Sequence, residues 1–485
     1  MAKILLTHAY FLRFDQKQWA TGLPYPPLGT LYAVAVLRTL SHEVEFADMM
    51  FANSPQDINQ QLTRQPSIFV IYDDGFNYLT KMCLTNMRLA AFEMIGLAKK
   101  AGCIIIVSGS DSTDHYEQYL DAGADFILMG EGEQTLAELV TAIDTQEDYT
   151  TIAGISFKKN NEVSKTSARP VIRALDSLPL PAWDLLDIRP YRKSWLKNAG
   201  YFSINIGTTR GCPYKCNWCA KPIYGNRYNA RSPANVVQEI KLLKELFAID
   251  HIWFCDDIFG LKPGWVEEFA DLVQEAELSF RFKIQSRADL LVQERYVEAL
   301  ARAGCEEVWM GAESGSQKVL DAMDKGITIA QVCEATRLLK KHELRPCFFV
   351  QFGYPGETRE DIALTIKMIN NLLPHQIGIS VSYPLPGTGF YEKVKAELKE
   401  KTNWTDSDEM ALMFRNTYPP SFYKQLHKYV HRNYRKQLAF QQLRKLLRKP
   451  SGARWSTLRK ALSGLYLAPW VYISSLRLKK LEEAP

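Results

Sequence analysis

Short apolar runs alternate with longer amphipathic segments over the first 145 residues. An apolar run of four to six residues predicts a buried strand, and the amphipathic segments at residues 29–40 and 135–143 predict helices. Because strands joined by helices form a parallel sheet, we expect a doubly wound, Rossmann-like α/β domain over residues 1–145. The predicted strands are residues 3–7, 44–47, 68–72, 103–108 and 126–129.

The same alternation resumes at residue 201 and continues to about residue 390. Six strand–helix units of this length predict a partial (β/α)6 TIM-type barrel, whose ligands lie at the carboxyl ends of the strands. Between the two domains, residues 146–200 are rich in charge and proline, and we interpret them as a linker with a small hairpin near residues 155–165. The predicted barrel strands are residues 201–206, 251–255, 280–284, 307–310, 347–352 and 376–382.

The last part of the chain, residues 391–485, is predicted to be helical and basic. Residues 421–485 hold 15 Lys and Arg against 2 Asp and Glu, whereas the first 420 residues hold 44 against 52. Residues 422–447 predict a basic amphipathic helix, and residues 462–473 are apolar and aromatic. Such a tail is typical of a segment that binds an anionic membrane surface. It is equally typical of a helix that covers the open edge of the barrel. No recognisable RNA-binding module accompanies the charge, so a nucleic-acid partner is not expected.

Composition narrows the class of protein. With 485 residues, 46% of them hydrophobic and 23% charged, the chain has the composition of globular domains, which excludes collagen, a coiled coil and wholesale disorder. We read no secretory signal in the first residues, and the uncharged run at residues 461–476 is shorter than the ~18–20 residues of a spanning helix. Nine cysteines are too few for a disulfide scaffold of this size. We therefore expect a cytoplasmic protein, with membrane association through the tail as an alternative.

Three cysteines carry the clearest chemical signal. Cys212, Cys216 and Cys219 follow the strand at residues 201–206 in a C-x3-C-x2-C loop with glycine and proline. Buried inert thiols and a zinc site are the alternatives, but zinc prefers a fourth protein ligand. Three thiolates on a four-iron cluster would leave one iron open to a substrate. We expect Cys333, by contrast, to pack in the core from a helix.

The cysteine loop resembles that of the radical S-adenosylmethionine (SAM) superfamily, including the aromatic Trp218 before the third cysteine. The resemblance implies that Cys212, Cys216 and Cys219 ligate a 4Fe–4S cluster whose fourth iron is chelated by SAM, with Trp218 beside the adenine. Later strand ends match the family as well, although each taken singly also reads as an ordinary turn or helix start. The implied SAM contacts there are Asp256 and Asp257 at the amino group, Glu313 and Ser314 at the ribose or methionyl part, and Gly353 and Gly356 at the adenine.

The amino-terminal domain is similar to the cobalamin-binding domain that precedes many radical SAM barrels. The similarity rests on the segment 26–29, the Gly109 loop and the segment 125–136, and it implies that Gly109, Gly130 and Glu131 contact cobalamin. The D-x-H-x-x-G signature is absent, so no residue is expected as a cobalt ligand. A vestigial sheet that supports the barrel is the alternative.

Together the resemblances imply an enzyme that cleaves SAM to a 5′-deoxyadenosyl radical, with cobalamin as the methyl carrier for an unactivated carbon. A radical oxidoreductase or cyclase of the anaerobic porphyrin-cyclase type is the alternative among enzymes, and a non-catalytic iron–sulfur redox sensor is the alternative from another class. The implied partners are a small-molecule or lipid-like substrate and an external electron donor such as flavodoxin or ferredoxin.

Overall fold

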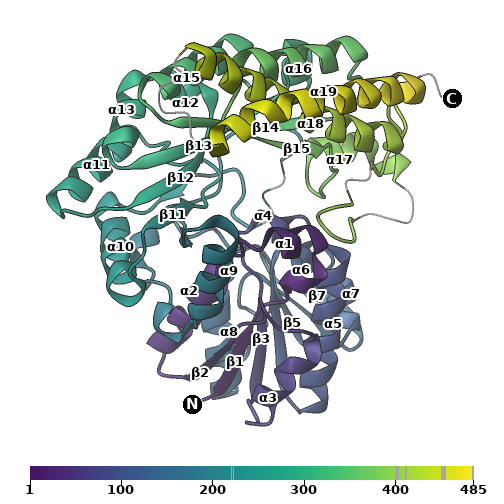
Figure 1. The fold of residues 1–485 in the computed structure, drawn as a ribbon. Helices are drawn as coiled ribbons and strands as arrows, with labels where there is room; N and C mark the ends of the chain where they lie inside the picture. Colours follow the sequence, from purple (N-terminus) through teal and green to yellow (C-terminus); the bar gives the residue numbers. More distant parts are fainter. Residues whose placement is uncertain (220, 222, 399–402, 410–411, 449–454, 483–485) are drawn as a thin grey trace.

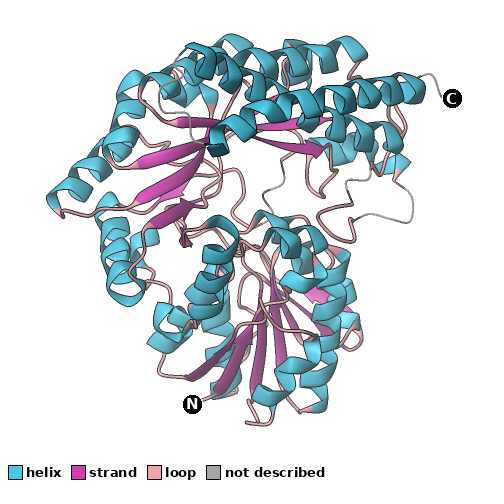
Figure 2. Ribbon diagram, viewed as in Figure 1, coloured by secondary structure: helices cyan, strands magenta, loops and turns pink. Residues whose placement is uncertain are grey.

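The computed structural model describes residues 1–485 except residues 220, 222, 399–402, 410–411, 449–454 and 483–485. The chain folds into two α/β units and a helical carboxyl-terminal region (Figures 1 and 2). One unit is built on a seven-stranded sheet and the other on a six-stranded sheet. The expected fold class is confirmed.

The first sheet has the strand order β2-β1-β3-β4-β5-β6-β7. Its first five strands are parallel, and β6 and β7 continue it as an antiparallel hairpin. The sheet therefore extends beyond residue 145, because the hairpin of the expected linker pairs with β5 and is part of the domain. The strands are β1 (Lys3–Thr7), β2 (Glu43–Ala47), β3 (Ile68–Tyr72), β4 (Ile104–Ser108), β5 (Phe126–Leu128), β6 (Ile155–Lys159) and β7 (Glu162–Lys165).

Helices cover both faces of this sheet. Successive strand residues alternate between the two faces: Leu5 and Ile71 lie in one apolar cluster, whereas Leu6 and Val70 lie in the other. The first cluster includes residues of α5 (Thr85–Lys100) and α7 (Tyr116–Asp121), and the second includes residues of α2 (Leu28–Thr39) and α8 (Glu133–Thr145). The order of the parallel strands puts the topological switch point, where ligands bind in such sheets, between β1 and β3.

The second sheet is an open parallel half-barrel with the order β15-β14-β13-β12-β11-β8. The six predicted strands are confirmed, with bounds that shift by a few residues and a longer β13. They are β8 (Ser203–Ile206), β11 (His251–Phe254), β12 (Arg281–Ser286), β13 (Cys305–Glu313), β14 (Arg345–Phe352) and β15 (Gln376–Val381). Its longer helices are α10 (Pro233–Phe247), α11 (Trp265–Glu275), α13 (Glu294–Arg302), α15 (Ile329–Lys341) and α16 (Arg359–Leu372).

Helix α15 corrects one expectation. Cys333 is exposed, although we expected it in the core. The buried face of α15 carries Val332, Ala335 and Leu339. Cys333 follows Val332 by one residue, which is about 100° around the helix and off that face.

Short elements complete the two units. They are α1 (Gln16–Thr21), α3 (Asn59–Leu62), α4 (Tyr78–Lys81), α6 (Ser110–Asp114), α9 (Arg189–Ala199), α12 (Ala288–Leu291), α14 (Gln317–Ala322) and α17 (Gly389–Val394). The two-residue strands β9 (Thr209–Arg210) and β10 (Asn229–Ala230) pair antiparallel and close the base of the cysteine loop.

Two long helices, α18 (Pro420–Arg448) and α19 (Trp455–Glu482), form the carboxyl-terminal region. Leu426 and Val430 of α18 are buried in the barrel's apolar core. The hydroxyl of Tyr434 donates to the carbonyl oxygens of Pro374 and His375, both at 2.7 Å, just before β15. Helix α18 thus covers the barrel at β15. This is one of the two roles that we expected for the tail, the covering of the open barrel edge. No helix in the described part of the chain is long and apolar enough to cross a membrane.

Candidate functional site

The three cysteines lie in the loop that β9 and β10 close. Cys212 is buried, and Cys216 and Cys219 are partly exposed. Burial, together with the neighbouring Asp257 and Cys212, raises the pKa of Cys219 to about 12. Burial likewise raises the pKa of Cys212, with Cys216 acting in the same direction. The three thiols are therefore within electrostatic reach of one another, although no three His, Cys, Asp or Glu side chains of the described residues already converge as a metal site.

Cations surround these thiols. Arg287 Nη1 lies 4.0 Å from Cys216 Sγ, and Lys325 also acts electrostatically on Cys216. Lys81 and Lys221 act in the same way on Cys219. Nearby cations favour thiolates, which are the form of cysteine that binds metal. A set of three thiols with four cations around it fits an anionic iron–sulfur cluster.

Asp256 holds the loop that leads to the cysteines. Its carboxylate accepts hydrogen bonds from the backbone N–H of Thr208 (2.7 Å) and Thr209 (2.8 Å), and from the Thr208 hydroxyl (2.5 Å). Burial raises the pKa of Asp256 to about 6, against the lowering effect of these hydrogen bonds. We expect this carboxylate at the amino group of SAM, and within the protein it contacts the backbone of Thr208 and Thr209 and the Thr208 hydroxyl.

Asp257 connects the barrel to the first domain. Its Oδ1 lies 3.1 Å from Lys81 Nζ, at the end of α4. The pair is partly buried, and it places a residue of the amino-terminal domain beside the cysteine loop, because Lys81 also acts on Cys219.

Glu313 and Trp218 come together at the end of β13. Glu313 Oε1 lies 2.7 Å from Lys325 Nζ in a buried ion pair, and the same ammonium lies 5.7 Å from the centre of the Trp218 ring. The backbone of Glu313 has φ +53°, a left-handed conformation that non-glycine residues rarely adopt, and such strain clusters at functional sites. Trp218 Nε1 is buried without a hydrogen-bond partner among the described residues. Ser314 is buried beside them and bonds Thr365 Oγ1 at 3.0 Å.

The loop after β14 contains a residue that sequence reasoning missed. Gly353, at φ +77°, donates its N–H to Glu357 Oε2 at 2.6 Å, and Gly356 has φ +80°. Burial raises the pKa of Glu357 to about 8. The Pro355-Gly356-Glu357 run marked this turn in the sequence, but nothing there indicated that its carboxyl group would be buried.

A second missed residue is Arg210, two positions before Cys212. Its guanidinium lies 2.6 Å from Glu131 Oε1 and 2.8 Å from Glu133 Oε1, and all three side chains are buried. Glu131, expected as a cobalamin contact, is therefore engaged by the cysteine loop. The charge pairing crosses between domains, so no local sequence pattern could have revealed it.

The carboxyl edge of the first sheet faces this region and has unsatisfied polar atoms. The hydroxyls of Tyr10, after β1, and Ser110, after β4, are buried and make no hydrogen bond with the described residues. Gly109 packs closely, since a Cβ there would meet Asp73 Cβ at 2.9 Å, whereas at Gly130 the nearest atom would be 3.7 Å away. Orphaned buried hydroxyls are costly unless a ligand satisfies them, so this edge fits a polar cofactor such as cobalamin.

His8 follows β1 and is engaged within the domain. Its Nδ1 accepts from the Tyr10 N–H at 3.2 Å, and its Nε2 lies 2.9 Å from Asp48 Oδ1. Both ring nitrogens thus contact groups of the protein itself.

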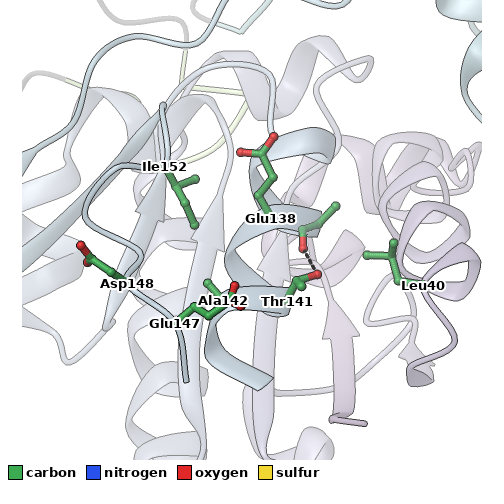
Figure 3. Close-up of a pocket in the computed structure, with 8 residues that line it drawn as sticks. Leu40, Glu138, Thr141, Ala142, Glu147, Asp148 and Ile152 are labelled. Carbon is green, nitrogen blue, oxygen red and sulfur yellow. Dashed lines mark hydrogen bonds between the residues drawn. The ribbon is translucent and has the colours of Figure 1, made fainter. Parts of the chain in front are cut away.

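One cavity of the described residues lies elsewhere. It is a shallow hollow of about 380 Å³ on the outer side of α8, between Leu40, Glu138 and Ile152 (Figure 3). None of the predicted site residues lines it.

Comparison with known proteins identifies the second domain and the fold. Residues 206–369 match the Radical SAM superfamily. An uncharacterized methyltransferase of Pyrococcus horikoshii is 28% identical over 389 residues, covering 79% of this chain and 82% of that protein. The anaerobic magnesium-protoporphyrin IX monomethyl ester cyclase of Synechocystis is 26% identical over 371 residues, covering 76% and 72%.

Two solved structures share the fold of most or all of the chain. The cobalamin-dependent SAM radical enzyme OxsB, solved with aqua-cobalamin, superposes with a TM-score of 0.74 at 19% identity, covering 99% of this chain and 72% of that one. The methyltransferase TsrM of Kitasatospora setae, solved with cobalamin and a 4Fe–4S cluster, has a TM-score of 0.66 at 20% identity, covering 81% and 78%. The likeness to OxsB extends through the carboxyl-terminal helices.

Proposed function

This chain carries a radical SAM domain at residues 206–369, and from that premise we propose that it methylates an unactivated carbon of a small molecule with the help of cobalamin. The observation that carries the proposal is the meeting of two features. The cation-lined cysteine loop and the carboxyl edge of the Rossmann-like sheet face one another, joined by Arg210 and Glu131. An enzyme that used SAM and cobalamin on one substrate would need both beside a common space.

The residues where the cysteine loop meets the edge of the sheet have specific roles in this proposal. In the proposal Cys212, Cys216 and Cys219 hold the cluster, and Asp256 fixes the approach of their loop through Thr208 and Thr209. When bound, the reduced cluster supplies the electron that cleaves SAM to a 5′-deoxyadenosyl radical. The protein's own task is to orient the reactants and exclude water.

Trp218, Asp256, Asp257, Glu313 and Ser314 remain our proposed SAM contacts. The Lys325–Glu313 pair offers both signs of charge there, which suits the ammonium and carboxylate of an amino acid. Gly353 and Gly356 carry no side chain at two positions of the turn after β14, and at Gly356 no atom lies within 4 Å of the Cβ position, which leaves room for a flat base.

A radical cyclase or oxidoreductase is the second candidate, favoured by the similarity to magnesium-protoporphyrin ester cyclases. Methyl transfer ranks first because a methyltransferase is the relative with the higher identity and coverage. Either chemistry consumes electrons from outside, because the cleavage of SAM is reductive, so we also propose a small electron-transfer partner such as flavodoxin or ferredoxin.

One experiment separates the readings. Protein reconstituted anaerobically with iron, sulfide and hydroxocobalamin is given SAM, dithionite and a small-molecule extract, and the nucleoside products are quantified. Methyl transfer predicts S-adenosylhomocysteine and 5′-deoxyadenosine in equal amounts. A cyclase predicts 5′-deoxyadenosine alone, and a redox sensor predicts neither.

A further inference from the structure

Helix α19 presents a row of apolar side chains to solvent. At about 100° per residue, these positions fall on one face of the helix. The opposite face carries Ala461, Val471, Ser474 and Leu478, which are buried. Single exposed apolar residues are ordinary, whereas a contiguous row marks an interaction surface. The row, hereafter the α19 stripe, comprises Leu462, Leu465, Tyr466, Trp470, Tyr472, Ile473 and Leu476, each between 38% and 70% exposed.

The stripe cannot turn inward, because the other face of α19 is fixed to the protein. Arg432 of α18 donates to the Ser474 hydroxyl at 2.7 Å, and Gln425 donates to the Ser474 carbonyl at 3.2 Å. At the helix end, Glu482 lies 3.6 Å from Arg359 of the barrel helix α16. The apolar face is therefore held outward in the folded protein.

Positive charge brackets the stripe. Residues 461–476 carry no charge, while Arg459 and Lys460 precede them and Arg477, Lys479 and Lys480 follow, all exposed. By helical spacing, Arg459, Arg477 and Lys480 fall on the same side as the stripe, at its two ends. Aromatic and aliphatic side chains between basic residues are typical of helices that lie in a membrane interface.

We propose that the α19 stripe docks this protein on an anionic phospholipid surface, with α19 lying in the plane of the interface. At 1.5 Å per residue the uncharged segment is about 24 Å long, too short to span the bilayer core but long enough to lie on it. Charge complementarity selects the occupant. The segment 421–485 carries 15 basic and 2 acidic residues, so a second copy of the same surface would be repelled, whereas anionic lipid would be attracted. The inference does not depend on the reaction proposed above.

The test uses the full chain and sedimentation with vesicles of phosphatidylcholine, with or without phosphatidylglycerol. We expect binding to the anionic vesicles and at least tenfold weaker binding to neutral ones. Leu465→Asp with Tyr472→Asp should lower the affinity at least tenfold. Leu89→Asp, at an equally exposed leucine on α5 (57%, against 60% for Leu465), should leave it unchanged.

A second variant tests the charge. Arg477→Glu with Lys480→Glu should weaken binding to anionic vesicles by roughly fivefold or more per charge, since each basic residue at an anionic surface contributes about 1 kcal/mol. Equal binding to both kinds of vesicle, or full binding by the Leu465→Asp, Tyr472→Asp protein, would overturn the proposal. So would a wild-type dimer, seen by light scattering, that the stripe variant converts to a monomer, because the stripe would then be an interface between copies.

Discussion

Arg210 Nη1 lies 2.6 Å from Glu131 Oε1, and this buried contact ties the cysteine loop of one domain to the last parallel strand end of the other. Arg210 also reaches Glu133, so a single cation pairs with two carboxylates across the contact between the domains. The pairing thus links the cysteine loop to the loop after β5. We therefore expect a substitution in either loop to affect the structure of the other.

Removing this cation should destabilise the protein strongly. Arg210→Ala leaves Glu131 and Glu133 buried and unpaired, a change that typically costs about 3–5 kcal/mol. The exposed pair Arg38–Asp184 offers a matched control, since Arg38→Ala should cost roughly 1 kcal/mol or less. Denaturant unfolding measures the free energy of unfolding of the two variants. Similar losses of stability in both would mean that the Arg210 ion pairs do not stabilise the contact between the domains.

The cysteines provide a second prediction. Reconstituted wild-type protein should contain about four irons per chain and a brown chromophore that air bleaches. Alanine at Cys212, Cys216 or Cys219 should remove the iron and the production of 5′-deoxyadenosine together, because we propose each thiolate as a ligand. Cys333→Ala, at an exposed thiol on α15, should preserve both. Full iron content in the triple alanine variant would rule out the cluster assignment.

The sequence predicted the strands well because their signal is local. Apolar runs such as β3 are buried wherever they lie in the sheet. The spacing of Cys212, Cys216 and Cys219 can likewise be recognised in the sequence without knowledge of the fold. The partners of Asp256 and Glu131 could not be predicted, since they come from residues distant in the chain. The prediction that Cys333 is buried in the core was wrong, because a shift of one position along a helix moves a side chain to a different face.

Glu357 should make stability depend on pH. Burial raises its pKa from 4.5 to about 8, so the folded protein holds this proton more tightly than the unfolded chain. The stabilisation is then complete below about pH 4.5 and is lost as the pH rises through 8. Between pH 5 and pH 9 the loss should be roughly 2–4 kcal/mol in urea unfolding, and Glu357→Gln should reduce it. Identical pH profiles for the two proteins would contradict the assignment.

Helix α18 should be needed for folding even though it is basic. Leu426 is buried in the barrel core, so Leu426→Ala should cost about 2–5 kcal/mol. Leu447 lies on the same helix but is 75% exposed, and Leu447→Ala should have little effect. Thermal unfolding distinguishes them. Equal stability of the two variants would indicate that α18 does not support the barrel. In that case, removal of residues 421–485 would leave the protein soluble, whereas aggregation is the result that we expect.

Cobalamin binding should depend on the two orphaned hydroxyls at the edge of the sheet. Because His8 already uses both ring nitrogens, protein desalted after loading with hydroxocobalamin should retain about one corrin per chain with a base-off spectrum. Tyr10→Phe and Ser110→Ala remove hydroxyls that have no partner among the described residues, so neither should lower the stability of the corrin-free protein. If a corrin satisfies these hydroxyls, both variants should retain less of it and keep the cluster intact. Unchanged retention would place the corrin elsewhere, and no retention by the wild type would turn the ranking to a cobalamin-independent radical oxidoreductase.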